Sequence, residues 1–105
     1  MVNRKQALQQ LLEEKPADSF IRFALSIEYI KEGDDRNAVM LLKQLSQDDP
    51  EYLALYYHLG KAYERLNSAE DAIATYRMGM HVAKKQNDLK TFSELNVAIM
   101  LLDDE

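Results

Sequence analysis

The sequence predicts an all-α fold built from antiparallel helix hairpins. Glycine and proline are scarce, with three and two residues in a chain of 105, so the elements between them should be long and uninterrupted. Apolar residues recur at helical spacing over most of the chain. Pro16 and Pro50 lie 34 residues apart, and the same offset pairs several core-type residues. A period of this length is typical of a helix–turn–helix repeat.

The 34-residue offset relates two copies of one pattern. Each pair at this offset joins identical residues, two small residues or two large ones, and we predict that these ten residues form the structural core of the repeats. The pairs are Leu25 with Leu59, Ser26 with Gly60, Tyr29 with Tyr63, Ala38 with Ala72, and Leu42 with Tyr76. A small residue in the middle of a helix in both copies implies that a neighbouring helix passes close to the backbone there, since glycine inside a helix costs about 1 kcal/mol relative to alanine.

Local signals divide each copy into two helices. Pro16 and Pro50 are each expected to open a helix at its first position, where the missing N–H costs nothing. The segments Gly33-Asp34 and Leu66-Asn67-Ser68 interrupt the apolar pattern, and Gln86-Asn87-Asp88 forms the last turn. The expected helices are 3–14, 16–31, 35–47, 50–66, 69–86 and 89–102.

Several polar residues near these boundaries are expected to cap helices. Ser68, with Asp71 three residues later, resembles a capping box. Asp88 is the expected N-cap of the last helix. The acidic pairs 34–35 and 48–49 are likewise interpreted as caps rather than as catalytic carboxylates, because carboxylates at helix starts bind orphan N–H groups.

The pattern in residues 53–86 closely resembles the tetratricopeptide repeat. The resemblance rests on Tyr56-x-x-Leu59-Gly60-x-x-Tyr63 followed by Ala72 and Tyr76. Residues 19–52 match less closely, because Arg22 stands where a large aromatic residue is usual. The resemblance implies a right-handed superhelix of antiparallel helix hairpins, with two repeat units, an N-terminal helix and a C-terminal capping helix.

We therefore predict a single domain over residues 1–105 with five segments. These are a leading half-repeat helix at 1–15, the first repeat at 16–49, the second repeat at 50–86, a capping helix at 87–102 and a frayed acidic tail at 103–105. The last helix is out of strict register with the others. Inserting two residues would align Phe92, Leu95 and Ile99 with Tyr56, Leu59 and Tyr63.

The resemblance also implies a function, which is to bind a peptide or a helical segment of a partner protein in a concave groove. The first helix of each hairpin would line this groove. The implied partner-binding residues are Phe20, Phe23, Ile27 and Ile30 in the first copy, and Tyr57, His58, Lys61, Glu64 and Arg65 in the second. Some relatives clamp the C-terminal carboxylate of chaperones with Lys and Asn, but Phe23 and Ile27 occupy those positions here, so this activity is rejected. An apolar groove with Lys61 and Arg65 at one side suits an amphipathic helix or an apolar peptide with acidic flanks.

Residues 20–30 leave a second hypothesis open, because this helix is apolar almost all round and must be buried on every side. One interpretation is that the N-terminal helix covers it through Leu8, Leu11 and Leu12. The other is an exposed patch for a partner or for a second copy of the chain, which would make the protein a self-assembling, homodimeric unit.

Other functions find little support in the sequence. The chain has no cysteine, and His58 and His81 lie on different expected helices without a metal-ligand spacing, so we expect no metal and no cofactor. The net charge of −5 disfavours nucleic acid and anionic membranes, and no apolar run is long enough to span a bilayer. We expect a cytoplasmic protein that is not an enzyme, with an enzyme as a remote alternative.

Overall fold

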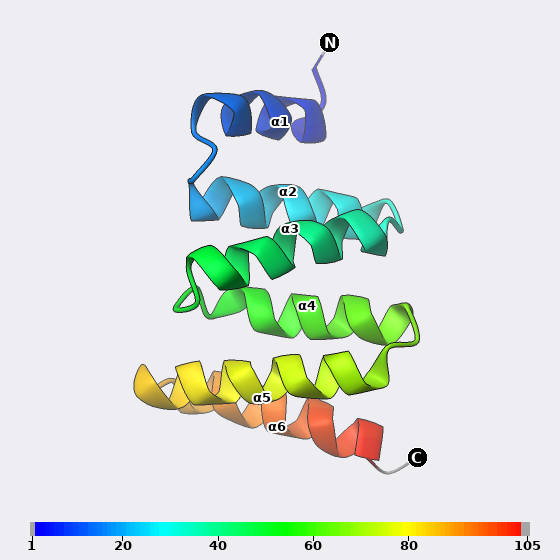
Figure 1. The fold of residues 1–105 in the computed structure, drawn as a ribbon, viewed down its shortest axis with the longest axis vertical. Helices are drawn as coiled ribbons and strands as arrows, with labels where there is room; N and C mark the ends of the chain where they lie inside the picture. Colours follow the sequence, from blue (N-terminus) through cyan, green and yellow to red (C-terminus); the bar gives the residue numbers. More distant parts are fainter. Residues whose placement is uncertain (1, 104–105) are drawn as a thin grey trace. The chain divides into compact units, whose positions relative to one another are not determined.

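The structure is a computed structural model that describes residues 2–103. This part of the chain contains six α-helices and no strand, so the predicted all-α class is confirmed (Figure 1). The helices are α1 (Arg4–Glu14), α2 (Ser19–Lys31), α3 (Asp35–Asp48), α4 (Ala54–Arg65), α5 (Ala69–Lys85) and α6 (Leu89–Asp103). They belong to two compact units: unit 1, Met1–Tyr52, holds α1 to α3, and unit 2, Leu53–Glu105, holds α4 to α6.

The two prolines lie in turns before the helices, so the prediction that they open the helices was wrong. In the first turn the N–H of Asp18 donates to the carbonyl of Lys15, and in the second the N–H of Tyr52 donates to the carbonyl of Asp49, both at 3.1 Å. Each proline is the second residue of a four-residue turn, a position that its fixed φ favours. The helices α2 and α4 begin only after these turns have ended.

Three helices of the chain end in the same left-handed turn. Gly33, Asn67 and Asn87 have φ of 76°, 61° and 59°. After each of them, the next N–H donates to a helix carbonyl five residues back, at 2.9 Å: Asp34 to Tyr29, Ser68 to Tyr63, and Asp88 to Ala83. These bonds satisfy carbonyls that the end of a helix leaves without partners. Gly33 and Asn67 are 34 residues apart, so the repeat extends to the backbone conformation.

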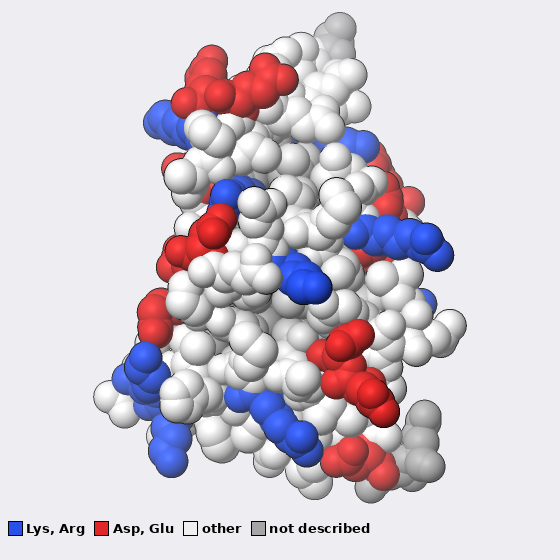
Figure 2. Space-filling view, viewed as in Figure 1, with Lys and Arg blue, Asp and Glu red and all other residues white. Residues whose placement is uncertain are grey.

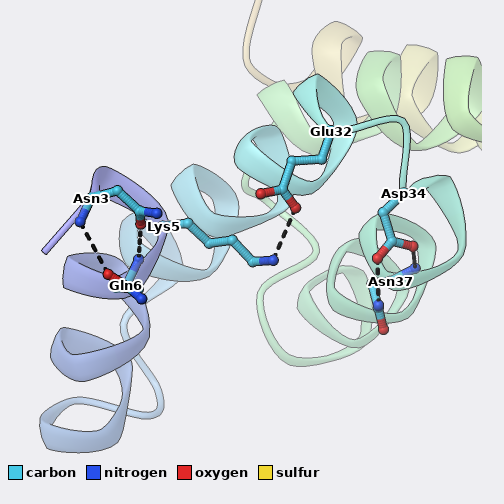
Figure 3. A network of polar contacts seen from close by, with 6 residues as sticks. All are labelled: Asn3, Lys5, Gln6, Glu32, Asp34 and Asn37. Atoms are coloured by element: carbon cyan, nitrogen blue, oxygen red, sulfur yellow. Dashed lines mark hydrogen bonds and ion pairs between the residues drawn. The ribbon is translucent and has the colours of Figure 1, made fainter.

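Carboxylate and amide side chains cap the starts of four helices. Asp18, Asp34 and Asp88 accept bonds from the N–H groups of Ile21, Asn37 and Thr91, at 2.9, 3.2 and 3.0 Å. Asn3 forms a reciprocal capping box with Gln6 at the start of α1 (Figure 3). The bonds from Asn37 lower the pKa of Asp34. The caps expected at Asp34 and Asp88 are therefore confirmed.

Two other expected caps were wrong. Ser68 makes no side-chain bond to the start of α5. Asp48 and Asp49 lie at the end of α3 rather than at the start of α4, because the Pro50 turn separates them from that helix. Asp48 instead pairs with Nη1 of Arg22 at 2.8 Å, and Asp49 accepts a bond of 2.6 Å from the Ser19 hydroxyl. Both carboxylates thus join the end of α3 to the start of α2.

In unit 1 the N-terminal helix packs against α2. Leu8 is buried with Ile21, Ala24 and Leu25, while Leu12 lies at the margin of this cluster. Leu11 is exposed, so two of the three leucines expected to cover α2 do so.

Polar contacts between α1 and α2 add to this packing. The Lys5 Nζ lies 2.9 Å from a Glu32 oxygen (Figure 3). The same ammonium group lies 4.7 Å from the centre of the Tyr29 ring, and Arg4 pairs with Glu28 at 3.3 Å.

In unit 2 two glycines allow α5 to approach its neighbours closely. A Cβ atom at Gly60 would lie 2.1 Å from Cε1 of Tyr76, and one at Gly79 would lie 2.6 Å from Cβ of Tyr56 and 2.8 Å from a Leu95 methyl group. No real Cβ atom tolerates such distances, so both positions require glycine. The Tyr76 ring fills the space beside Gly60 and packs with Ala72, Leu95, Ala98 and Ile99.

The ten residues of the repeated pattern do not share one degree of burial. Eight of them are buried: Leu25, Ser26, Ala38, Leu42, Leu59, Gly60, Ala72 and Tyr76. Tyr29 and Tyr63 are half-buried, because each packs at the margin of the core cluster of its own unit. The Lys5 ammonium group lies over the outer face of the Tyr29 ring.

The contact between Gly60 and Tyr76 predicts an unusual response to a helix-favouring substitution. Gly60→Ala should destabilise the protein by ~1–3 kcal/mol through overpacking, although alanine is the better helix former, and Gly60→Leu should destabilise it further. Chemical denaturation followed by circular dichroism measures this loss. The matched control is Gly60→Ala in a Tyr76→Leu background, where the smaller side chain should reduce the penalty. A Gly60→Ala variant as stable as the parent protein would contradict the packing described.

Candidate functional site

A hollow on unit 2 lies between the first helix of its hairpin and the last helix of the chain. Its volume is about 360 Å³, and it is lined by Tyr57 from α4 and by Ser93, Glu94 and Val97 from α6. Residues three and four positions apart share one side of a helix, which explains why these three residues of α6 lie together. The hollow therefore combines an aromatic ring, an aliphatic side chain, a hydroxyl and a carboxylate.

Tyr57 is the main apolar surface of this hollow. The residue is 38% exposed, although its helix buries Tyr56 almost completely. The Lys61 Nζ lies 5.5 Å from the centre of the Tyr57 ring, within the range of a cation–π contact. The His58 ring stands perpendicular to the Tyr57 ring at 5.7 Å between centres. These two neighbours hold Tyr57 from the sides and leave part of its surface open.

A contact between aromatic rings and partly buried polar contacts connect Tyr57 to the core of unit 2. The centres of the Tyr57 and Tyr76 rings are 6.5 Å apart, and the Tyr76 hydroxyl donates a hydrogen bond to the Glu64 carboxylate. Burial raises the pKa of Tyr76, and the bond to Glu64 raises it further, so this hydroxyl keeps its proton at neutral pH. Glu64 also pairs with Lys61 at 3.5 Å. The ammonium group of Lys61 is thereby held next to the Tyr57 ring.

His58 lies half-buried beside the hollow. Its burial lowers the pKa of the imidazole below the ordinary 6.5, and the positive charge of Arg65 lowers it further. The ring is therefore neutral at pH 7, when one of its nitrogens can donate a hydrogen bond and the other can accept one. Arg65 itself is exposed at the end of α4.

The apolar residues expected to bind a partner in the first copy lie on α2 of unit 1 and differ in exposure. Phe20 is 63% exposed. Phe23, Ile27 and Ile30 are half-buried, and the Phe23 ring packs on the Tyr52 ring with 5.4 Å between centres. Of the four residues, Phe20 is therefore the most exposed.

Sequence reasoning missed the contribution of α6 to the hollow. Ser93, Glu94 and Val97 line it beside Tyr57, but none of them was among the expected partner-binding residues. A signal for them was present in the two-residue shift that aligns Phe92, Leu95 and Ile99 with the second copy. The same shift places residues 93, 94 and 97 in register with 57, 58 and 61. Because the resemblance implies a capping role for the last helix, it does not by itself point to these residues.

Residues 2–103 lack the features of two other kinds of site. Within residues 2–103, no three His, Asp or Glu side chains lie close enough together to hold a metal ion. None of the helices in this range has both the length and the apolar character that crossing a lipid bilayer requires. On the face drawn in Figure 2, basic and acidic side chains alternate, and neither sign gathers into a large patch among the residues described.

Comparisons with known proteins agree with the repeat pattern. The sequence model of the tetratricopeptide repeat family matches residues 29–92. A TPR repeat-containing protein of Pseudomonas aeruginosa is 26% identical over 98 residues, which cover 93% of each chain. The tetratricopeptide repeat domain of a Salinibacter ruber protein, solved by NMR, is 42% identical with a TM-score of 0.80 and covers 85% of this chain and 90% of that one.

A third protein resembles this chain in fold alone. The solution structure of a Bordetella parapertussis protein is 22% identical, with a TM-score of 0.85, and covers 99% of this chain and 90% of that chain. Together with the helix order observed above, these matches confirm the predicted class of helical repeats.

The environment of His58 predicts a measurable titration. Its pKa in the folded protein should lie below 6.5, and Arg65→Gln should raise it partway towards that value by removing one positive charge. Because His58 then binds a proton more tightly in the unfolded chain than in the folded protein, its protonation should reduce the free energy of unfolding as the pH falls below 6.5. NMR titration of the imidazole Cε1 proton measures both values. A folded-state pKa at or above 6.5 would rule out the buried, neutral ring described here.

Proposed function

Because the chain belongs to the tetratricopeptide repeat family, we propose that it is an interaction module that binds a peptide or helical segment of a partner protein. Repeats of this family generally mediate protein–protein interaction and are typically non-catalytic scaffold modules. The proposal for this chain goes further, since it assigns binding to a particular surface. That surface is the hollow of unit 2 between α4 and α6.

The observation that carries the proposal is the partly open Tyr57 ring. Large aromatic side chains that are held rigidly contribute strongly to interfaces, because they bury much area at a low cost in conformational entropy. Tyr57 is held by Lys61 and His58 at its sides and contacts Tyr76 beneath. Val97 faces it across the hollow, so an apolar side chain of a partner could fit between the two.

The charges around the hollow support a partner segment of particular chemistry. Lys61 and Arg65 bring positive charge on the α4 side, while Glu94 brings negative charge on the α6 side. A bound segment would therefore be an amphipathic helix or an extended peptide with an apolar residue at Tyr57. Acidic residues of this segment would lie towards α4, because opposite charges orient a partner more than they strengthen its binding.

The exposed apolar residues of α2 form a separate candidate surface, on unit 1. Phe20 would contribute most to it, with smaller parts from Phe23, Ile27 and Ile30, which are half-buried. Burial of other α2 residues within unit 1 weakens the alternative of self-assembly through residues 20–30. Ile21, Ala24 and Leu25 are buried within unit 1, so the surface left for a second copy on this helix is small.

Selected peptides give the direct test of the hollow. Segments of about 15 to 20 residues, displayed from the proteome of the native host, would be selected on the whole protein and their affinities measured by fluorescence anisotropy. Tyr57→Ser and Val97→Ser should each weaken binding at least about ten-fold, which corresponds to ~1.4 kcal/mol. The control is Met78→Ser, an exposed apolar residue on α5 of the same unit. Equal losses in all three variants, or none in the first two, would exclude the hollow as the binding surface.

A matched pair of variants tests the contact on α2. Selected peptides whose binding Tyr57→Ser leaves unchanged are expected to use this surface, and Phe20→Ser should weaken them by roughly three-fold to ten-fold, because one exposed aromatic contact contributes on the order of 1 kcal/mol. Met40→Ser on α3 removes an apolar side chain of similar exposure in unit 1 and should have no effect. If Phe20→Ser leaves every selected peptide unaffected, α2 takes no part in binding.

A further inference from the structure

The charges of α1 are arranged in the order that is least favourable for a helix. Arg4 and Lys5 lie in its first turn, and Glu13 and Glu14 lie in its last turn. Each pair has the same sign as the helix dipole at its end, so both pairs weaken the helix. With 11 residues, α1 is also shorter than the about 12–15 residues at which isolated helices become even marginally stable. Although a capping box supports its start, α1 is therefore helical chiefly because it docks on α2.

Few side chains attach α1 to α2. Of the residues of α1, only Leu8 is buried, and Leu12 is half-buried. The ion pairs that Arg4 and Lys5 make with α2 each include a well-exposed side chain, so they contribute little to stability. The helix α3, by comparison, buries three side chains. Segments with few buried contacts open at a lower free energy than the core, so α1 should open while α2 and α3 stay folded.

Opening of α1 would uncover a surface of α2 with a defined pattern, here called the α1 seat. It consists of Ile21, Ala24, Leu25, Glu28 and Glu32, whose spacing places them on one side of the helix. The three apolar residues pack in one cluster with the main leucine of α1, and the two glutamates pair with its basic residues (Figure 3 shows the pair at Glu32). The glutamates lie near the negative end of the α2 dipole, which favours cations further. This pattern selects an amphipathic helix with basic residues in its first turn and an apolar stripe after them.

Part of the space beside this seat is left open by α1. A cavity of about 270 Å³, here called the unit 1 cavity, is lined by residues of α1, α2 and α3, among them Leu12, Leu25, Met40 and Leu41. All of its lining side chains are uncharged, so a charged group would lose hydration there without gaining a partner. Closer packing against these side chains would add dispersion contacts. A helix with a bulkier apolar residue at the position of Leu12 would therefore fit this place better than α1 does.

We propose that α1 is a displaceable cover, and that the α1 seat binds an amphipathic helix of a partner protein. The partner helix would have basic residues in its first turn and a bulky apolar residue at the position of Leu12. Because α1 is tethered to its seat, it competes at an effective concentration on the order of 1 mM. The apparent affinity of the partner is thus reduced by the fraction of time for which α1 is open. The α1 seat lies on unit 1, so this binding does not depend on the hollow of unit 2.

Hydrogen exchange of the whole chain tests the opening of α1. After correction for intrinsic rates, the amides of Leu8 and Leu12 should exchange at least about thirty-fold faster than those of Leu42 and Leu45 in α3, because α1 opens alone. Both helices belong to unit 1, so unfolding of the whole unit would expose their amides together. Equal protection of α1 and α3 would overturn the proposal.

A fluorescent peptide of residues 2–15 measures binding to the α1 seat directly. Leu8→Glu in the whole chain removes the main apolar contact of α1 and leaves every residue of the seat unchanged. The peptide, which keeps Leu8, should bind this variant at least about ten-fold more tightly than the parent protein in fluorescence anisotropy. Leu11→Glu is the matched control, because Leu11 is exposed on the same helix, and it should behave as the parent does. If circular dichroism shows that Leu8→Glu unfolds unit 1, Arg4→Glu with Lys5→Glu serves instead, since it repels α1 from the seat without changing the core.

Two changes in the peptide test the chemistry of the partner. Arg4→Glu with Lys5→Glu should weaken binding to the opened protein at least about ten-fold, because both ion pairs become repulsive contacts. Leu12→Phe should strengthen binding by about three-fold to ten-fold, because the ring enters the unit 1 cavity.

Four results of these titrations would overturn the proposal. The first is equal binding of the peptide to the parent and to the opened protein, and the second is no binding to either. The third is a peptide whose binding is unchanged by reversal of its two basic residues, or weakened by Leu12→Phe. The fourth is a parent protein that sediments as a dimer and becomes a monomer on Leu8→Glu, which would assign the seat to α1 of a second copy.

Discussion

The contact between Tyr76 and Gly60 is the interaction on which unit 2 depends most. The ring lies where any side chain at position 60 would clash, so it sets how closely α5 approaches α4. From this position its hydroxyl holds Glu64, Glu64 holds Lys61, and Lys61 lies over the Tyr57 ring. The shape of the proposed binding surface is thus determined by a packing contact in the core. Rigid support of this kind is what allows a single exposed aromatic residue to serve as an anchor.

Unit 1 uses the same helix hairpin with different means of attachment. Ser26 takes the place of Gly60, and polar contacts run from α1 to α2 as well as from α2 to the end of α3. Such exposed ion pairs contribute little to stability, typically below about 1 kcal/mol each. The burial of Leu8 against Ile21, Ala24 and Leu25 therefore contributes more to holding α1 in place. The inner side of α1 thus covers apolar residues of α2, while its outer side is polar apart from Leu11.

The last helix contributes both to the core of unit 2 and to the hollow, and both contributions follow from its composition. Its inner side completes the core of unit 2 through Leu95, Ala98 and Ile99. One edge of its outer side lines the hollow with Ser93, Glu94 and Val97, while Met100 and Leu101 are exposed elsewhere on the helix.

The class of fold, the 34-residue period and the approximate extent of each helix could be predicted from the sequence, because these depend on spacing and on local preferences that recur in both copies. It also indicated the turn at Gly33 and the cap at Asp88, where one residue and its near neighbours decide the conformation. The folded structure was needed to show that Pro16 and Pro50 precede the helices, that Tyr29 and Tyr63 are half-buried, and that α6 shares a hollow with Tyr57. These features depend on how closely two helices approach and which sides they turn to each other. Helical periodicity fixes the side on which a residue lies, whereas the neighbour that meets this side is chosen by side-chain volumes in the packed core.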